Sequence, residues 1–162
     1  MVHIRRAQSG DEETLARIQT ESWKAAFAGI VPAELLAQCT NVERAEKMYA
    51  RLLAERRGNG YILELDGKAH CIAWWDAAKD DDMPGAAELR CIYSLPDNWR
   101  RGYGSRMMER VLTDVKAAGY ETIVLWVFAR NERAIRFYEA HGFAASGKTQ
   151  SAFGTVEEMY VK

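Results

Sequence analysis

The sequence lacks an excess of basic residues, a long apolar run and a cysteine pattern typical of metal sites. Its 162 residues include 22 Lys and Arg against 23 Asp and Glu, a formal net charge of −1, which argues against a nucleic acid partner. No run approaches the apolar length of a membrane span, and residues 1–6 contain no apolar signal region. We therefore expect a cytoplasmic protein with no nucleic acid partner and no membrane partner.

Cysteine is scarce, and the spacing of the cysteines argues against a metal site. Cys39, Cys71 and Cys91 are odd in number and lack metal-ligand spacing, so we expect no metal. The three side chains are predicted to be buried thiols in a reducing compartment. The length predicts a single domain over residues 1–162, large enough to bury a real core.

A glycine loop that opens a helix is the most informative segment. After Trp99, the loop consists of Arg100, Arg101, Gly102, Tyr103, Gly104 and Ser105. The two glycines let a polyanion reach the main chain, where N–H groups and the positive end of a helix dipole converge. The two arginines add donors that suit phosphate oxygens. The loop therefore predicts a phosphate or pyrophosphate site, with a tight turn carrying two exposed arginines as the alternative.

Other phosphate-binding motifs match this loop less well. The P-loop pattern requires a lysine after its second glycine, and the dinucleotide fingerprint requires a third glycine where Met107 stands. Apolar residues recur at helical spacing after Gly104, and residues 89–93 before the loop alternate in part like a strand. The unit is a predicted strand, phosphate loop and helix.

A second segment, residues 131–143, places a tyrosine on the inner face of a short predicted helix. Asn131 is a good N-cap residue and Gly142 suits the position after the last turn. Asn131 and Tyr138 are seven positions apart and project on nearly the same side, with the small Ala134 between them. A polar group, a small residue and a phenol therefore line one groove. The alternative for Tyr138 is an ordinary buried tyrosine with a bonded hydroxyl.

Together the two segments resemble the GNAT superfamily of acetyl-CoA-dependent N-acetyltransferases, over roughly residues 85–145. The resemblance implies that Asn131 and Tyr138 face the pantetheine arm of coenzyme A, for which the small Ala134 leaves room. It also implies that Tyr138 is the general acid that protonates the departing thiolate. One position departs from the family pattern, because Trp99 stands where the family has Gln or Arg; the adjacent arginines can supply the charge instead.

The same resemblance implies an opened sheet. The central strand and the strand ending near Phe128 are expected to splay apart, so that their backbone groups pair with the pantetheine amides. The main chain at Ile92, Tyr93 and Ser94 would then bind the acetyl-pantetheine end. A backbone N–H at this point could polarise the thioester carbonyl as an oxyanion donor.

The predicted elements form a mixed, mostly antiparallel α/β sheet flanked by helices, which matches the family architecture. A hairpin turns at Asp66-Gly67, a strong two-residue turn signal. The expected strands are residues 2–7, 61–65, 68–77, 89–93, 122–128, 143–148 and 156–161, and the expected helices are 11–26, 33–38, 42–56, a helix beginning near 104, and 132–141.

An amine acceptor must lose a proton before it attacks a thioester, and a positioned carboxylate is the usual base. Glu88, near the start of the central strand, is the first candidate, with an exposed strand-end carboxylate as the alternative. Asp76 is a weaker candidate. The acidic residues 80–82 either attract a cationic substrate or form a solvated loop. Cys91 could act as a nucleophile, but no histidine is placed to activate it, which favours a strand core residue.

The resemblance implies transfer of the acetyl group of acetyl-CoA to an amine of a small molecule or peptide by direct attack in a ternary complex. A homodimer is compatible with this interpretation. The alternative from another class is a non-catalytic acyl-CoA-binding sensor, which would need neither Tyr138 nor a base; a transferase for longer acyl chains is a third. An aromatic acceptor wall is expected from Trp23, Phe27, Ile30, Trp74, Trp75 and Phe153.

Overall fold

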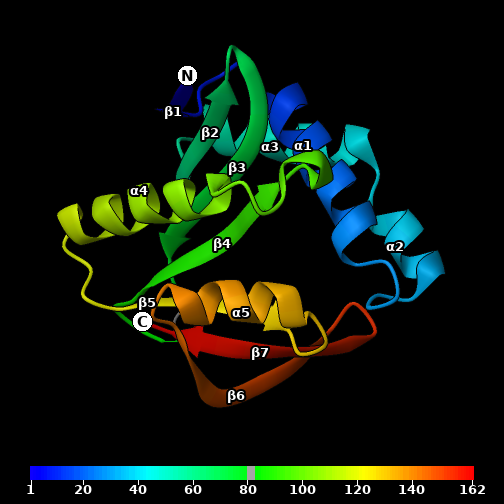
Figure 1. The fold of residues 1–162 in the computed structure, drawn as a ribbon, viewed down its shortest axis with the longest axis vertical. Helices are drawn as coiled ribbons and strands as arrows, with labels where there is room; N and C mark the ends of the chain where they lie inside the picture. The colour runs from blue at the N-terminus through cyan, green and yellow to red at the C-terminus, as the bar shows by residue number, and fades with distance from the viewer. Residues whose placement is uncertain (80–82) are drawn as a thin grey trace.

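The computed structural model describes residues 1–79 and 83–162, and within this range seven strands form one sheet (Figure 1). The strands lie in the order β1-β2-β3-β4-β5-β7-β6, and every neighbouring pair is antiparallel except β4 and β5. The strands are β1 (Val2–Arg6), β2 (Asn59–Leu65), β3 (Lys68–Ala77), β4 (Ala87–Ser94), β5 (Ile123–Phe128), β6 (Ala144–Ala152) and β7 (Thr155–Val161). The helices are α1 (Glu12–Ala26), α2 (Ala33–Cys39), α3 (Val42–Ala54), α4 (Tyr103–Ala117) and α5 (Glu132–Ala140), with a 3₁₀ turn at Pro96–Asn98.

Helices cover both faces of the sheet. Helices α4 and α5 lie in front of it in Figure 1, and α1 and α3 lie behind it. On the front face, α4 buries Met107, Met108, Val111 and Val115, which recur at the spacing of one helical face. Burying a side chain of this kind contributes about 1.5–3 kcal/mol, so this face holds α4 against the sheet.

The centre of the sheet is open between β4 and β5. These parallel strands pair only at Ala87 with Ile123 and at Glu88 with Val124. Beyond Glu88, β4 has no further strand partner on this side among the described residues. The mixed, mostly antiparallel sheet with splayed central strands is therefore confirmed.

A β-bulge changes the direction of β4 where the strands separate. Trp74 pairs with Cys91 and Trp75 pairs with Leu89, so Arg90 is an extra residue in β4. A bulge of this kind bends the strand and re-aims its side chains. As a result, Cys91 belongs to the cluster on the α1 face, whereas Leu89 belongs to the cluster on the α4 face.

Some sequence-based expectations are wrong in detail. Strand β6 is longer than expected and its side chains are almost all exposed, so it carried little apolar signal. Only Cys71 is fully buried, whereas Cys39 and Cys91 are half-buried; Cys91 lines the cavities beside β4. Residues 80–82, for which a solvated loop and the attraction of a cationic substrate are the two alternatives, lie outside the described residues.

Candidate active site

The glycine loop turns the chain sharply into α4. Gly102 is the N-cap residue with φ +82°, and Arg100 also has a positive φ of 64°. The Gly102 carbonyl accepts the Arg106 N–H at 3.1 Å. The N–H groups that open a helix have no intrahelical partners, so those of residues 103–105 are available to an anion at the positive end of α4.

Gly104 lets α4 and α5 approach each other, a role that sequence reasoning did not assign to it. A Cβ atom at this position would lie 3.3 Å from Cε1 of Phe137. The hydroxyl of Ser105 lies 3.1 Å from Nε2 of His141, which ties the same two helices together. The start of α4 is therefore in contact with α5, the helix that carries Tyr138.

Trp99 forms a platform for Arg133. Its indole Nε1 donates a hydrogen bond to the Ser94 carbonyl at 2.8 Å, which fixes the ring. The guanidinium carbon of Arg133 lies 3.7 Å from the ring centroid, in cation–π geometry. Arg133 thus places a cation beside Trp99, the position at which the family pattern has Gln or Arg. Sequence reasoning missed it, because a contact between residues 99 and 133 depends on the tertiary fold.

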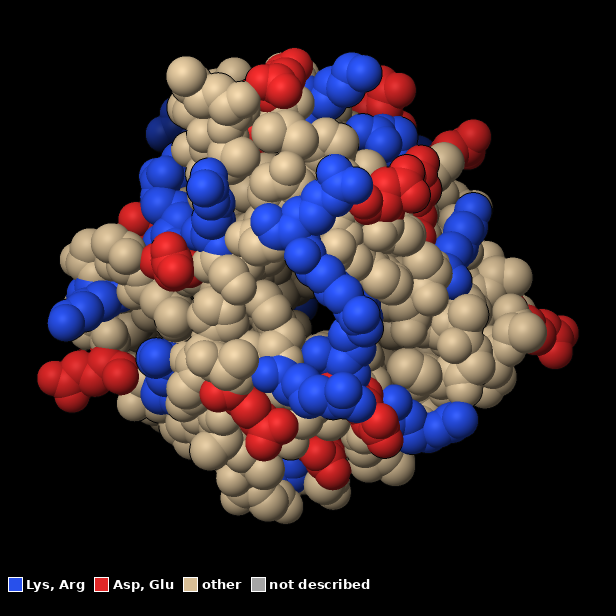
Figure 2. Space-filling model, in the orientation of Figure 1, with Lys and Arg blue, Asp and Glu red and all other residues tan. Residues whose placement is uncertain are grey.

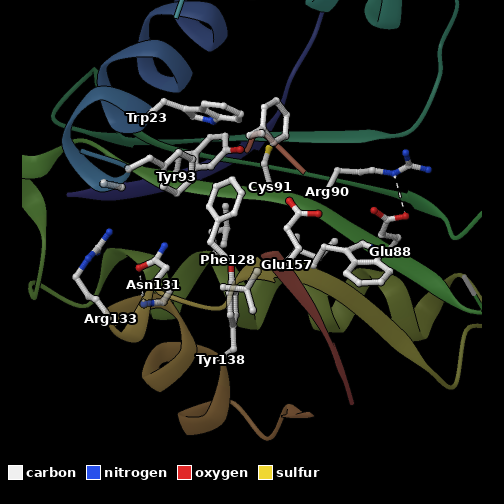
Figure 3. A pocket seen from close by; sticks show the side chains of 18 of the residues that line it. Trp23, Glu88, Arg90, Cys91, Tyr93, Phe128, Asn131, Arg133, Tyr138 and Glu157 are labelled. Atoms are coloured by element: carbon white, nitrogen blue, oxygen red, sulfur yellow. Dashed lines mark hydrogen bonds and ion pairs between the residues drawn. The ribbon is translucent and has the colours of Figure 1, made fainter. Parts of the chain in front are cut away.

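Helix α5 presents the residues expected from the sequence. Asn131 is a buried N-cap whose side chain accepts the Ala134 N–H at 3.3 Å. Tyr138 points from α5 into a cavity, toward Phe128 (Figure 3). Among the described residues, the Tyr138 hydroxyl forms no hydrogen bond with another protein group.

Two cavities meet at Tyr138. The loop cavity, about 370 Å³, is bounded by the glycine loop, including Gly102, Tyr103 and Gly104, and by α5. The central cavity, about 590 Å³, extends from Tyr138 past Glu88 and Cys91 to Trp23 and Phe153. Figure 2 shows a hollow on this face with Lys and Arg side chains gathered along it. Six residues line both cavities: Ala26, Ile92, Tyr93, Arg133, Ala134 and Tyr138.

The opened edge of β4 runs along this junction. Ile92 and Tyr93 line both cavities, and Ser94 lines the loop cavity. The Ser94 carbonyl already accepts hydrogen bonds from Trp99 Nε1 at 2.8 Å and from the Ser22 hydroxyl at 3.2 Å. This carbonyl therefore anchors the 3₁₀ turn and α1 to β4. The sequence-predicted residues of the loop, β4 and α5 are brought together, although Arg100 and Arg101 are exposed.

Two carboxylates line the central cavity. Glu88 is 8% exposed, so it is not the exposed strand-end carboxylate considered as an alternative, and its Oε1 lies 3.7 Å from Arg90 Nε. Glu157 of β7 points into the cavity between Phe128 and Glu88, and its Oε2 accepts a hydrogen bond from Gln150 at 2.8 Å (Figure 3). Sequence reasoning missed Glu157, because only the pairing of Glu157 with Phe128 brings it here.

Asp76, the second carboxylate candidate, is opposite Glu88 in the β3–β4 register but does not line the central cavity. It lines a neighbouring cavity beneath α3. Of these two carboxylates, Glu88 shares a cavity with Tyr138 and Asp76 does not. No group of His, Cys, Asp and Glu that could hold a metal ion occurs among the described residues.

Burial shifts the ionisation of the groups around the junction. Burial raises the pKa of the Tyr138 phenol above its ordinary value, and the neighbouring Cys91 raises it further, while the Arg133 charge opposes the shift. Burial also raises the pKa of the Cys91 thiol to about 12. Both groups are therefore protonated at neutral pH, which suits a proton donor and does not suit a thiolate nucleophile.

Aromatic rings enclose the outer end of the central cavity. Trp23 packs edge-to-face with Phe27 at 4.9 Å and with Phe153 at 5.2 Å between ring centroids, and Phe128 contacts both phenylalanines. Of the residues expected to form an acceptor wall, Trp23, Phe27 and Phe153 line this cavity. Trp75 was wrongly included, because its indole points into the α4-side core and donates to the Tyr61 hydroxyl at 2.9 Å. Trp74 lines the cavity beneath α3, and Ile30 lines neither the central nor the loop cavity.

Comparison with known proteins gives a consistent result. Residues 31–143 match the sequence model of the Acetyltransferase (GNAT) family. The chain is 24% identical over 141 residues to the uncharacterized N-acetyltransferase YuaI of Bacillus subtilis, covering 87% of this chain and 79% of that protein. It is also 24% identical over 168 residues to a spermidine N(1)-acetyltransferase of Thermoplasma acidophilum, covering 98% of each.

The fold is shared with solved structures as well. The crystal structure of the PaiA N-acetyltransferase from Thermoplasma acidophilum in complex with coenzyme A superimposes with a TM-score of 0.83 at 20% identity, covering 100% of this chain and 98% of that one. In the described part of the chain, no helix is both long and apolar enough to cross a membrane. With its family match spanning most of the sequence, the chain belongs to the GNAT acetyltransferase family and is an acyltransferase.

Proposed function

We propose that the protein transfers the acetyl group of acetyl-CoA to an amine of a small molecule or peptide by direct attack in a ternary complex. The observation that carries this proposal is the meeting of two cavities at Tyr138, in the gap between β4 and β5. A donor held in the loop cavity and an acceptor held in the central cavity would meet at that residue. Residues 1–162 would form one domain that contains the whole site. The proposed reaction would not require a homodimer.

The loop cavity would hold coenzyme A. The N–H groups of Gly102, Tyr103, Gly104 and Ser105 would bind the pyrophosphate, with Arg100 and Arg101 adding charge from the rim. We add Arg133 to this set, because its stacking on Trp99 fixes a cation at the cavity wall. The pantetheine arm would run past Asn131 and Ala134 toward Ile92, Tyr93 and Ser94. The coenzyme A bound to the related PaiA fold supports this ligand class.

Proton transfers would involve groups on both sides of the thioester. Glu88 would accept the ammonium proton of the acceptor, directly or through water, and the free amine would attack the carbonyl carbon. As the C–S bond breaks, Tyr138 would donate its proton to the thiolate of coenzyme A, and the second proton lost by the attacking nitrogen would return to the Tyr138 phenolate, while Glu88 releases its proton to solvent. Glu157 would hold the acceptor amine near Glu88 through charge attraction. The spermidine acetyltransferase relative supports an amine as the acceptor class.

A panel of amines tests this proposal. The protein is mixed with acetyl-CoA and each amine, and released thiol is measured against protein-free reactions. At least one amine should raise thiol release far above both the protein-free rate and the rate without amine, and mass spectrometry should find the acetylated product. Thiol release that never exceeds the protein-free rate, despite saturable acetyl-CoA binding, would favour the acyl-CoA-binding sensor instead.

A further inference from the structure

A third cavity lies beneath α3, on the sheet face opposite α4. This α3 cavity has a volume of about 700 Å³, within the size range of sites for small ligands. Among the described residues that line it, the cations are Arg44, Lys47, Arg51, Arg57 and Arg90, and the only carboxylate is Asp76. The cavity is therefore strongly positive, unlike the protein as a whole, whose formal net charge is −1.

Three of these cations are available to a ligand. Arg44, Lys47 and Arg51 lie three and four positions apart and so share one face of α3. In the described part of the chain, no carboxylate lies within ion-pair distance of any of the three. By contrast, Arg57 is paired with Glu55 at 3.3 Å. Like charges at this spacing destabilise a helix, so an anion here would relieve their repulsion.

The floor of the α3 cavity is apolar and aromatic. Tyr49 and Trp74 are buried side chains with ring centroids 5.6 Å apart, and Leu52 lies beside them. An apolar floor under a cationic rim suits a ligand with a short carbon chain and a terminal anion. The planar fork of arginine donors suits both carboxylate and phosphate groups.

The α3 cavity adjoins the central cavity. Arg90, Cys91 and Tyr93 line both, and Arg90 is the bulged residue of β4. The Arg90 guanidinium is held by the Ala77 carbonyl at 3.1 Å and by Glu88 at 3.7 Å, so it stands between the two spaces. The two cavities thus lie side by side, and an extended ligand that reached from one to the other would meet Glu88 at one end and the α3 cations at the other.

We propose that the α3 cavity binds the anionic group, a carboxylate or phosphate, of an amine acceptor whose amino group lies beside Glu88. This inference rests on the proposed function and narrows its substrate class to amines that carry a distant negative charge. A polyamine would place a second positive charge against Arg44, Lys47 and Arg51. Such an acceptor is therefore disfavoured at this site relative to an amino acid or a phosphorylated amine.

Matched acceptors test the proposal. 6-Aminohexanoate, its uncharged amide, 3-aminopropyl phosphate and spermidine are compared by kcat/KM with saturating acetyl-CoA. The double variant Arg44→Gln/Arg51→Gln removes two cations from the α3 cavity, and Lys68→Gln/Lys116→Gln removes two elsewhere. We expect the wild type to prefer the anionic acceptors over the amide. The first variant should lower kcat/KM for the anionic acceptors by at least about tenfold, leaving the amide unchanged, while the control behaves as wild type.

Binding without turnover separates this inference from the proposed function. Calorimetry measures 6-aminohexanoate and inorganic phosphate against protein saturated with coenzyme A. Binding of 6-aminohexanoate that is lost in Arg44→Gln/Arg51→Gln supports the α3 site even if no amine is acetylated. Acetylation of the acid and the amide at equal rates, in wild type and variant alike, overturns the inference while the proposed function stands. Variant-sensitive binding of phosphate without any effect on 6-aminohexanoate also overturns it, since the site then binds a separate anion.

Discussion

The loop cavity and the central cavity differ in how their walls are drawn from the chain. Most of the residues that line the loop cavity come from two short segments, residues 98–104 and 133–138. The central cavity instead combines Trp23 of α1, Glu88 of β4, Phe128 of β5 and Glu157 of β7. The loop cavity is therefore formed mainly by local backbone, whereas the central cavity is formed by side chains from elements that are far apart in the sequence.

This difference follows from what each side has to recognise. A pyrophosphate can be bound by helix-opening N–H groups, and the chain needs glycine and a turn to present them. An acceptor amine is recognised by the shape and charge of side chains, for which no fixed local pattern exists. We therefore expect changes on the loop side to act mainly on acetyl-CoA, and changes on the central side to act mainly on the amine. Tyr138 lies between them and should affect the chemical step alone.

Tyr138→Phe should give the largest effect. The change removes only the hydroxyl, so acetyl-CoA affinity should stay within about twofold, while single-turnover acetyl transfer should slow by about 10²–10⁴. Burial raises the pKa of the Tyr138 phenol, so the proton donor persists beyond its ordinary pKa of about 10. The wild-type rate should therefore show no loss of this proton below about pH 10. Rapid-quench measurements on the best acceptor, with Tyr120→Phe as the control, decide the matter; an unchanged chemical step would remove the phenol from the mechanism.

Glu88 and Glu157, the two carboxylates of the central cavity, should affect different kinetic constants. Glu88→Gln removes the proposed base and should lower kcat by about 10², most strongly where the acceptor amine is protonated. Glu157→Gln removes only a charge that attracts the amine, so KM should rise about tenfold with little change in kcat. Glu158→Gln, the next residue on β7, is the control because adjacent strand residues face opposite sides. If the pH–rate profile of Glu88→Gln matched that of the wild type, Asp76 would be the next candidate.

A proline in the first turn of α4 tests the loop side. Ser105→Pro removes one N–H that has no partner within the helix, and proline is tolerated in a first turn. Acetyl-CoA affinity should fall about tenfold, as expected for one lost hydrogen bond to a charged group, while KM for the amine should not change. Ser105→Ala, which keeps the N–H but loses the contact with His141, is the control. Equal affinities for the proline and alanine variants, measured by calorimetry, would contradict a pyrophosphate contact at this N–H.

Local signals in the sequence predicted most of the fold. The Asp66-Gly67 turn, the N-cap Asn131 and the apolar spacing of α4 all match the structure. The loop and α5 could be placed because each is a continuous segment. The pairing of Trp99 with Arg133 and the position of Glu157 could not, since both depend on which strands and loops become neighbours after folding.

The error at Trp75 has a simpler cause. Trp74 and Trp75 are adjacent in β3, so their side chains point to opposite faces of the sheet. Only one of them can face α1 and α3, and the structure gives that place to Trp74. Because side chains alternate between the two faces of a strand, one wall could not include both tryptophans. Which of the two faces α1 and α3 depends on the register of β3 with β2 and β4.

Cys91→Ala should give the smallest effect, although Cys91 lies between the central and α3 cavities. Burial raises the pKa of this thiol to about 12, so at pH 8 and at pH 9 alike the thiol is almost entirely protonated. A thiol in this state does not attack a thioester, and the acetyl group should pass directly to the amine. We expect kcat to change by less than about twofold, with Cys39→Ala as the control for loss of a half-buried thiol elsewhere. Incubation with radiolabelled acetyl-CoA alone should leave no label on the wild-type protein after denaturation. Label that appears on the wild type and disappears in Cys91→Ala, together with a large loss of kcat, would mean that the cysteine carries the acetyl group, and the ternary complex would then have to be abandoned.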